Sequence, residues 1–131
     1  MQRNFVNPWS WQEKYGFVHA NEVSGINRMV FVSGQTSVDD KGNLMHIGDM
    51  RAQVEQSLDN VETVLRHAGL GLADVVHLNI YTTDIRALMQ EHDYISERLK
   101  NAGCRHAGTL LGVTALAFTG LMVEIEATAV A

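Results

Sequence analysis

The sequence contains a single cysteine, Cys104, and a single proline, Pro8. One cysteine cannot form a disulfide within the chain, so the disulfide framework of a small secreted domain is excluded and a reducing cytoplasm is expected. The first residues lack the apolar core of a signal peptide, and no apolar run is long enough to span a membrane. We therefore expect a cytoplasmic protein without a membrane partner.

Positive charge is scarce as well. Ten Lys and Arg residues are outnumbered by 15 Asp and Glu residues, the formal net charge is −5, and the basic residues are scattered singly. Nucleic-acid binding depends on clustered cations at the phosphates, so we expect no nucleic-acid partner. The six histidines show no spacing typical of a metal site, and we expect neither a metal nor a cofactor.

The sequence does contain enough apolar material for one core. Of its 131 residues, 46% are hydrophobic and 19% are charged, which is usual for a globular domain. No linker or internal repeat divides the chain, so we expect a single domain over residues 1–131. Residues 1–15 are irregular by pattern, and we expect this N-terminal arm to pack on the domain through Trp9 and Trp11.

Hydrophobic periodicity predicts an alternation of strands and helices. Asp49 and Asp84 are each placed to cap a helix, and a glycine follows where each helix should end. Residues 29–33 form an apolar run typical of a strand buried on both faces, and Gly34 with Gln35 follows as a possible bulge. The predicted strands are 17–23, 29–33, 75–82, 106–113 and 121–131, and the predicted helices are 50–68 and 86–102.

Helices that connect strands in this order lie on one face of the sheet. We therefore expect an α/β fold with a mixed sheet of about six strands and two helices on one face. The second helix has a narrow apolar side formed by Leu88, Tyr94, Ile95, Arg98 and Leu99. The other face of the sheet is expected to hold Leu110, Met122 and Val130 beside Glu124 and Glu126. An open face of this size usually meets a partner, and a closed homo-oligomer is the simplest solution.

Two carboxylates stand two positions apart on the last predicted strand. Because successive side chains of a strand point to opposite faces, Glu124 and Glu126 share one face. Glu124 can hold a water for hydrolysis, since a carboxylate in a partly apolar cleft can have a raised pKa and act as an acid or base. The alternative is a carboxylate that only forms pairs at a subunit interface, and we expect Glu126 to be structural.

Two further side chains have chemistry of interest. Ser33 has no His or Asp pattern around it, which favours a hydrogen-bonding role over a nucleophilic one. Cys104 precedes Arg105 and His106, whose positive charge can favour a thiolate. The cysteine lies in a loop after a predicted helix, and we favour an unreactive residue. His106 opens the strand 106–113 and is a candidate neighbour of a site.

Four segments resemble the Rid family (YjgF/RidA, the reactive-intermediate deaminases, also called the endoribonuclease L-PSP family). They are residues 31–35, 56–61, 74–84 and 123–127, and the resemblance extends over about residues 16–131. It implies a chorismate-mutase-like α/β fold and a homotrimer with small-molecule clefts between its subunits. In the deaminase branch of the family, that cleft hydrolyses enamines and imines and releases ammonia.

The resemblance also assigns roles to particular positions. Glu124 matches the glutamate that positions the attacking water. Ser33 and Gly34 match a serine of the site and the glycine after it. The family's tyrosine falls on Phe17, and its arginine falls on Gly108. The expected substrate-binding residues are therefore Phe17, Ser33, Gly34, Gly108, Thr109 and Leu110, where Leu110 occupies the position of a common family cysteine.

The missing arginine changes the expected ligand. Glycine supplies none of the bidentate contact that an arginine makes with a carboxylate. Arg105 lies three residues away and should point to the other face of the strand. The resemblance is therefore to divergent subgroups, with an apolar cleft suited to a neutral or aromatic ligand and not to a simple 2-imino acid. The alternative is a non-catalytic ligand-binding or chaperone-like trimer, and the acidic balance disfavours a ribonuclease.

Overall fold

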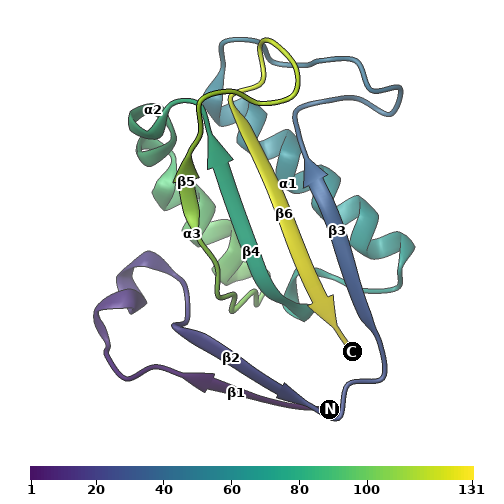
Figure 1. The fold of residues 1–131 in the computed structure, drawn as a ribbon, viewed down its shortest axis with the longest axis vertical. Helices are drawn as coiled ribbons and strands as arrows, with labels where there is room; N and C mark the ends of the chain where they lie inside the picture. Colours follow the sequence, from purple (N-terminus) through teal and green to yellow (C-terminus); the bar gives the residue numbers. More distant parts are fainter.

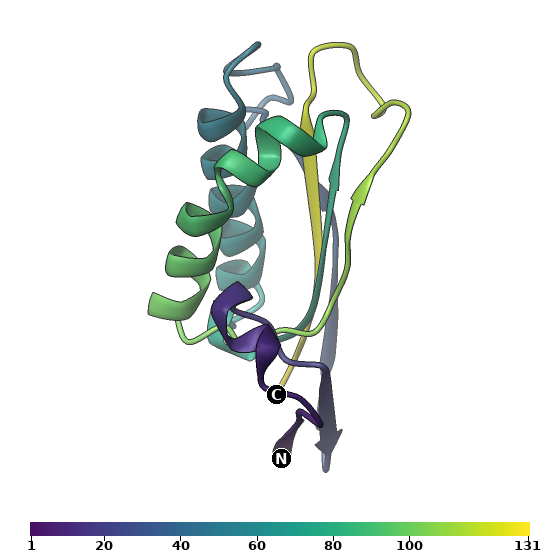
Figure 2. The same ribbon diagram turned by 90° about the vertical axis from the view of Figure 1, so that its left-hand side faces the viewer.

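Four strands form the main sheet of the computed structural model, which describes residues 1–131, and they are ordered β3-β6-β4-β5 (Figure 1). β6 pairs antiparallel with both β3 and β4, whereas β5 runs parallel to β4. The strand bounds are β3 Met29–Gln35, β4 Val75–Thr82, β5 Leu110–Gly112 and β6 Val123–Val130. Figure 2 shows all three α-helices on one side of this sheet. The predicted α/β fold is confirmed.

The other two strands form a separate sheet. β1 (Gln2–Val6) pairs antiparallel with β2 (Ala20–Ser24), and the 3-10 helix η1 (Trp11–Tyr15) lies between them in the chain. The expectation of an irregular segment 1–15 is therefore wrong, because tertiary contacts order it. The Arg3 guanidinium donates to Asn21 Oδ1 at 3.0 Å and to the carbonyl oxygens of Ala73, Val75 and Arg105. These bonds join the arm to the main sheet.

The helix α1 (Met50–His67) follows the predicted pattern. The Asp49 side chain accepts from the backbone N–H of Ala52 at 3.0 Å and caps the helix. Gly69, with a φ of 74°, follows the end of the helix in the left-handed conformation that favours glycine. The apolar stripe faces the sheet, and its buried members are Met50, Val54, Leu58, Val61 and Leu65. None of the helices is long and apolar enough to cross a membrane.

The second predicted helix is interrupted. It consists of α2 (Ile85–Gln90) and α3 (His92–Asn101), and a short 3-10 turn, η2 (Leu72–Asp74), precedes β4. Asp84 caps α2 by accepting from the Ala87 N–H at 3.0 Å. Glu91 stands at the interruption, where its carboxylate accepts from Arg51 of α1 at 3.1 Å. This bond to another helix is a tertiary feature that helical periodicity does not reveal.

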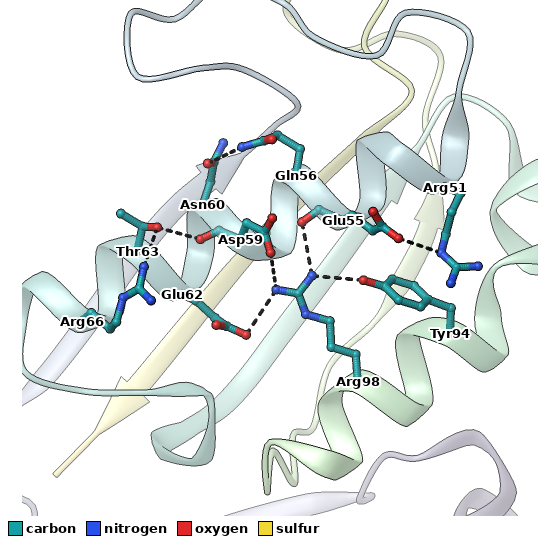
Figure 3. A network of polar contacts seen from close by, with 10 residues as sticks. All are labelled: Arg51, Glu55, Gln56, Asp59, Asn60, Glu62, Thr63, Arg66, Tyr94 and Arg98. Atoms are coloured by element: carbon teal, nitrogen blue, oxygen red, sulfur yellow. Dashed lines mark hydrogen bonds and ion pairs between the residues drawn. The ribbon is translucent and has the colours of Figure 1, made fainter.

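A charged network joins α1 to α3 on their outer side (Figure 3). Arg98 donates to Asp59 at 2.6 Å, to Glu62 at 3.2 Å and to the Glu55 carbonyl oxygen at 3.3 Å. Its side chain is only 19% exposed, so its stem lies along the apolar side as expected while its head binds carboxylates. The Tyr94 hydroxyl accepts from the same guanidinium at 3.2 Å.

The sheet face away from the helices is uncovered, and we call it the open face. It carries His77, Asn79 and Tyr81 of β4, Glu124, Glu126 and Thr128 of β6, and Met29, Phe31 and Ser33 of β3. Phe31 is 75% exposed, so the prediction that β3 is buried on both faces is wrong. Its alternate residue Val32 faces the core. The run 29–33 is apolar because one face of β3 packs in the core and the other face forms an apolar patch on the open face.

Three residues predicted for the open face are buried or pack against the core, and Met122 is one of them. Leu110 is the register partner of Ile80, a core residue, and it packs against the core. Val130 shares the face of its register partner Met29 but is buried at the end of β6, where the N–H groups of Asn27 and Arg28 donate to the Ala131 carbonyl oxygen. The alternation of β6 therefore fails at its last residues because a loop closes over them.

The Arg98 network should contribute measurably to stability. We expect Arg98→Ala to lower the free energy of unfolding by about 1–2 kcal/mol, because charge-assisted bonds and stem packing are lost together. Urea denaturation measures this change. The matched control is Arg66→Ala, an exposed arginine of α1 whose side chain hydrogen-bonds to Thr63 and to no carboxylate, where a loss below about 0.5 kcal/mol is expected. Equal effects of the two substitutions would contradict the role of the network.

Candidate functional site

A bulge in β3 brings three of the predicted site residues together. The register shifts between Val32 and Gln35, so Ser33 and Gly34 stand opposite a single residue of β6. A Cβ atom on Gly34 would lie 2.5 Å from Glu124 Oε1 and 2.8 Å from its Cγ. Only glycine lets the Glu124 side chain lie directly over the β3 backbone. The bulge thus places Ser33 and Gly34 next to Glu124 on β6.

The second carboxylate of β6 is held by hydrogen bonds. The Tyr81 hydroxyl donates to Glu126 Oε1, and Asn79 Nδ2 donates to the same oxygen at 3.0 Å. The Thr109 N–H donates to Asn79 Oδ1 at 2.9 Å and links this network to the strand beside it. Bonding to Tyr81, followed by Asn79, lowers the pKa of Glu126, and the same bond raises the pKa of Tyr81.

The two carboxylates thus differ in what surrounds them. Glu126 is committed to Tyr81 and Asn79, which agrees with the structural role expected for it. No residue of the chain donates a hydrogen bond to the carboxylate of Glu124. Its oxygens are free to accept from a water or a ligand, which is the chemistry that the sequence assigns to it.

A cavity of about 380 Å³ lies on the helix side of the sheet, beside α3 and η1. Four predicted site residues line it: Phe17, Gly108, Thr109 and Leu110. The core residues Leu78, Ile80, Ile95 and Leu99 form apolar walls, and the polar members are Tyr15, His92, Ser96, His106 and Thr109. No Lys, Arg, Asp or Glu side chain lines this cavity. It can hold an apolar group and offers no counter-charge to an ion.

Gly108 occupies a place that admits no side chain. A Cβ atom there would lie 1.7 Å from the carbonyl oxygen of Leu78. The backbone at the family's arginine position therefore leaves room only for glycine. Arg105 does not replace the missing cation, because its guanidinium lies over the Phe5 ring, 5.0 Å from the ring centroid, and outside the cavity lining.

The predicted site is divided within one chain. Ser33, Gly34 and Glu124 belong to the open face, whereas Phe17 and Leu110 line a cavity on the helix side. The sheet stands between the two groups. Within one chain, the residues of each group lie together, but the open-face group and the cavity group lie on opposite sides of the sheet.

The N-terminal arm contributes aromatic rings that sequence reasoning did not place. Trp11 packs edge-on against Phe17 at 5.8 Å and Tyr15 at 6.3 Å, and Trp9 packs against His19 at 5.0 Å between centroids. Both tryptophans remain largely exposed, at 61% for Trp9 and 53% for Trp11. Both pack against rings that follow the arm, Phe17 and His19, and Phe17 lines the cavity. The recurrence of aromatic residues at alternate positions over 9–19 is the sequence pattern that could have predicted this cluster of rings.

His106 lines the cavity, and the buried Cys104 lies next to it outside the lining. Burial raises the pKa of the Cys104 thiol to about 12, although Arg3 opposes the shift. Cys104 is thus a thiol, which agrees with the unreactive alternative. Burial, with smaller effects of His77 and Arg3, lowers the pKa of His106 to about 4. The Cys104 Sγ lies 3.9 Å from His106 Nδ1.

The fold and the divided site define a small α/β protein with a largely apolar cavity at one edge of its sheet. A sequence model of the family described as Endoribonuclease L-PSP matches residues 14–131. The chain belongs to this family, which is also the Rid or YjgF family.

Individual relatives agree with this assignment. A RutC family protein of Aquifex aeolicus is 30% identical over 105 residues, which are 80% of this chain and 82% of the relative. The crystal structure of YyfB from Yersinia pestis, a protein of unknown function of the conserved Rid family, has a TM-score of 0.88 at 35% identity and full coverage of both chains. The YjgF structure from E. coli has a TM-score of 0.70 at 28% identity, covering 86% of each chain.

The contact at Gly108 predicts a sharp intolerance. We expect Gly108→Ala to lower the free energy of unfolding by at least about 2 kcal/mol, because the new methyl overlaps the Leu78 carbonyl. Thermal and urea denaturation measure the loss. Gly71→Ala is the matched control, since no atom lies within 4 Å of its Cβ position. An unchanged free energy of unfolding for Gly108→Ala would show that the backbone before β5 moves to make room for the methyl group, and would contradict the predicted clash with Leu78.

The Glu126 network predicts a pH dependence. The folded pKa of Glu126 lies below its ordinary value of 4.5, so its contribution to stability is present above pH 4.5 and is lost as the pH falls through the folded pKa. Tyr81→Phe should raise the pKa of Glu126 and reduce this loss. A carboxyl-carbon NMR titration of both proteins checks it. An unchanged pKa of Glu126 in Tyr81→Phe would refute the assignment.

Proposed function

We propose that this protein hydrolyses a carbon–nitrogen double bond, of the enamine or imine type, in clefts between the subunits of a homotrimer. The division of the site carries the proposal. One chain presents a free carboxylate on an uncovered sheet face and an apolar cavity on the other side of the sheet. A neighbouring copy is the economical way to place the cavity of one subunit against the carboxylate of the next.

The open face supports an assembly of this kind. Phe31 is 75% exposed and Met29 is 45% exposed, and both lie on β3, beside the bulge that holds Glu124. Apolar side chains that remain exposed on a sheet face are typical of a surface that another chain covers. Covering this face also removes water from around Glu124, which strengthens its interactions with a bound substrate.

The chemistry assigned to Glu124 balances without a cofactor. Its carboxylate accepts a proton from a bound water while the water oxygen attacks the C=N carbon. The same proton then passes to the substrate nitrogen and gives a carbinolamine. Glu124 next takes the proton of the carbinolamine hydroxyl and passes it to the nitrogen, the C–N bond breaks, and the products are a carbonyl compound and ammonia. Ser33 and the backbone of Gly34 and Thr109 orient the substrate.

The cavity determines the class of substrate. It has apolar walls and no cationic side chain, so a carboxylate entering it loses hydration without gaining a partner. We infer a neutral substrate with an apolar or aromatic group, and not a simple 2-imino acid. The scarcity of clustered cations argues against RNA as the substrate.

A second function is a trimer that binds such a ligand without turning it over. One observation favours it: no residue of the chain donates a hydrogen bond to Glu124, so nothing within the chain fixes the direction of its carboxylate. The two functions differ only in turnover, and one measurement separates them.

Ammonia release from enamines and imines generated in situ tests the enzymatic function. We expect Glu124→Gln to lower the rate at least about 100-fold, because the amide cannot accept the proton of water. Glu97→Gln, an exposed glutamate of α3, is the matched control and should keep the wild-type rate. Equal rates in wild type and Glu124→Gln would leave the ligand-binding function for those substrates.

Subunit complementation tests the shared site. Glu124→Gln and Phe17→Ala should each be inactive alone, because each removes one half of the cleft. If the halves come from neighbouring subunits, refolding an equal mixture should restore about a quarter of the wild-type activity, since one interface in four is intact. No recovery in the mixed trimer, or a monomer by mass in solution, would refute the shared cleft.

A further inference from the structure

The size and lining of the cavity suit a small uncharged molecule. Its volume of about 380 Å³ falls in the range of roughly 300–1,000 Å³ that small-molecule sites have. A dry cavity of less than half this size, about 150 Å³, is known to bind benzene. Its walls include Phe17, Leu78, Ile95 and Leu99, and no charged Lys, Arg, Asp or Glu side chain faces it.

The cations nearest the cavity are engaged elsewhere. Arg3 donates to three carbonyl oxygens and to Asn21. Arg105 lies over the ring of Phe5. His92 lines the cavity, and its Nδ1 lies 3.9 Å from the exposed Asp93 carboxylate. Lys14 lies over the Tyr15 ring at 5.0 Å from the centroid and, with Lys100, lines a separate polar pocket. No Lys or Arg side chain belongs to the lining of the cavity.

His106 presents a hydrogen-bond donor of defined position. Cys104 keeps its proton, and the thiol reaches His106 Nδ1 at 3.9 Å. We assign to the neutral imidazole the tautomer in which Nδ1 accepts from the Cys104 thiol and Nε2 carries the single N–H. No residue of the chain hydrogen-bonds to Nε2, and His106 lines the cavity.

The other polar groups of the lining are less suited to this role. Ser96 Oγ donates to the Tyr15 carbonyl oxygen at 3.2 Å, and the Thr109 N–H donates to Asn79. Tyr15 is exposed, and its ring packs edge-on against His92 at 5.7 Å. His106 is the half-buried donor without a partner.

We propose that His106 is the specificity-determining residue of the cavity, which selects a neutral ring-bearing molecule through an acceptor atom that binds Nε2–H. A carbonyl oxygen or an imine nitrogen supplies such an atom, whereas a carboxylate adds a charge that the cavity does not balance. This deepens the proposed function, on which it rests in treating the cavity as the substrate pocket.

Three probes of matched size test the proposal on the full chain. Acetophenone offers a neutral acceptor, ethylbenzene has no acceptor, and benzoate is an anion. Titration followed by Trp11 fluorescence measures binding, because Trp11 packs against two rings of the cavity lining. We expect wild type to bind acetophenone about five-fold more tightly than ethylbenzene, and benzoate at least about ten-fold more weakly than acetophenone.

Substitution of His106 then identifies the donor. In His106→Phe the preference for acetophenone over ethylbenzene should vanish while ethylbenzene still binds, which shows that the cavity is intact. His67→Phe, on the exposed end of α1, is the matched control and should keep the preference. The ¹⁵N shifts of His106 in wild type should report the Nε2–H tautomer.

Several results overturn the proposal. They are a preference that survives in His106→Phe, a preference that is lost in Tyr15→Phe or His92→Phe instead, benzoate binding as tight as acetophenone binding, and no binding of any probe. These titrations involve no turnover, so their failure leaves the ammonia-release test of Glu124 unaffected. Conversely, a loss of the enzymatic function in that test leaves the binding result in place.

Discussion

The pairing of β6 with strands on both of its sides is the constraint on which the rest of the structure depends. Because β6 lies between β3 and β4, its residues alternate strictly between the core under α1 and the open face over most of its length. Val123, Ile125 and Ala127 complete the core. Glu124 and Glu126 point to the open face. There Glu124 lies over Gly34 of β3, and Glu126 accepts hydrogen bonds from Asn79 and Tyr81 of β4.

Two close backbone approaches then define the site. At Gly34 the absence of a side chain makes room for Glu124. At Gly108 the backbone passes so near Leu78 that no side chain fits, and the strand presents an apolar edge to the cavity in place of a cation. The proposed chemistry rests on these contacts, which leave the Glu124 carboxylate without a hydrogen-bond donor and the cavity without a charged Lys, Arg, Asp or Glu lining.

Local features of the sequence were sufficient to predict much of this fold. The apolar stripe and the Asp49 cap predicted α1, the alternation in 75–82 predicted β4, and Gly34 marked the bulge. The interruption at Glu91 and the ordering of the arm by Arg3 were not predictable in this way. They depend on partners that lie 40 and up to 102 residues away in the chain.

The sequence by itself determined the fold class, the family and the fact that Glu124 and Glu126 share a face, because caps and side-chain periods act over a few neighbouring residues. Only the tertiary structure decided which of the two carboxylates accepts hydrogen bonds from other side chains of the chain. The Tyr81 hydroxyl donates a hydrogen bond to Glu126, 45 residues away in the sequence, whereas no residue of the chain donates a hydrogen bond to Glu124. The tertiary structure also separated Phe17 and Leu110 from Glu124 by a sheet, since strand order decides which side chains meet.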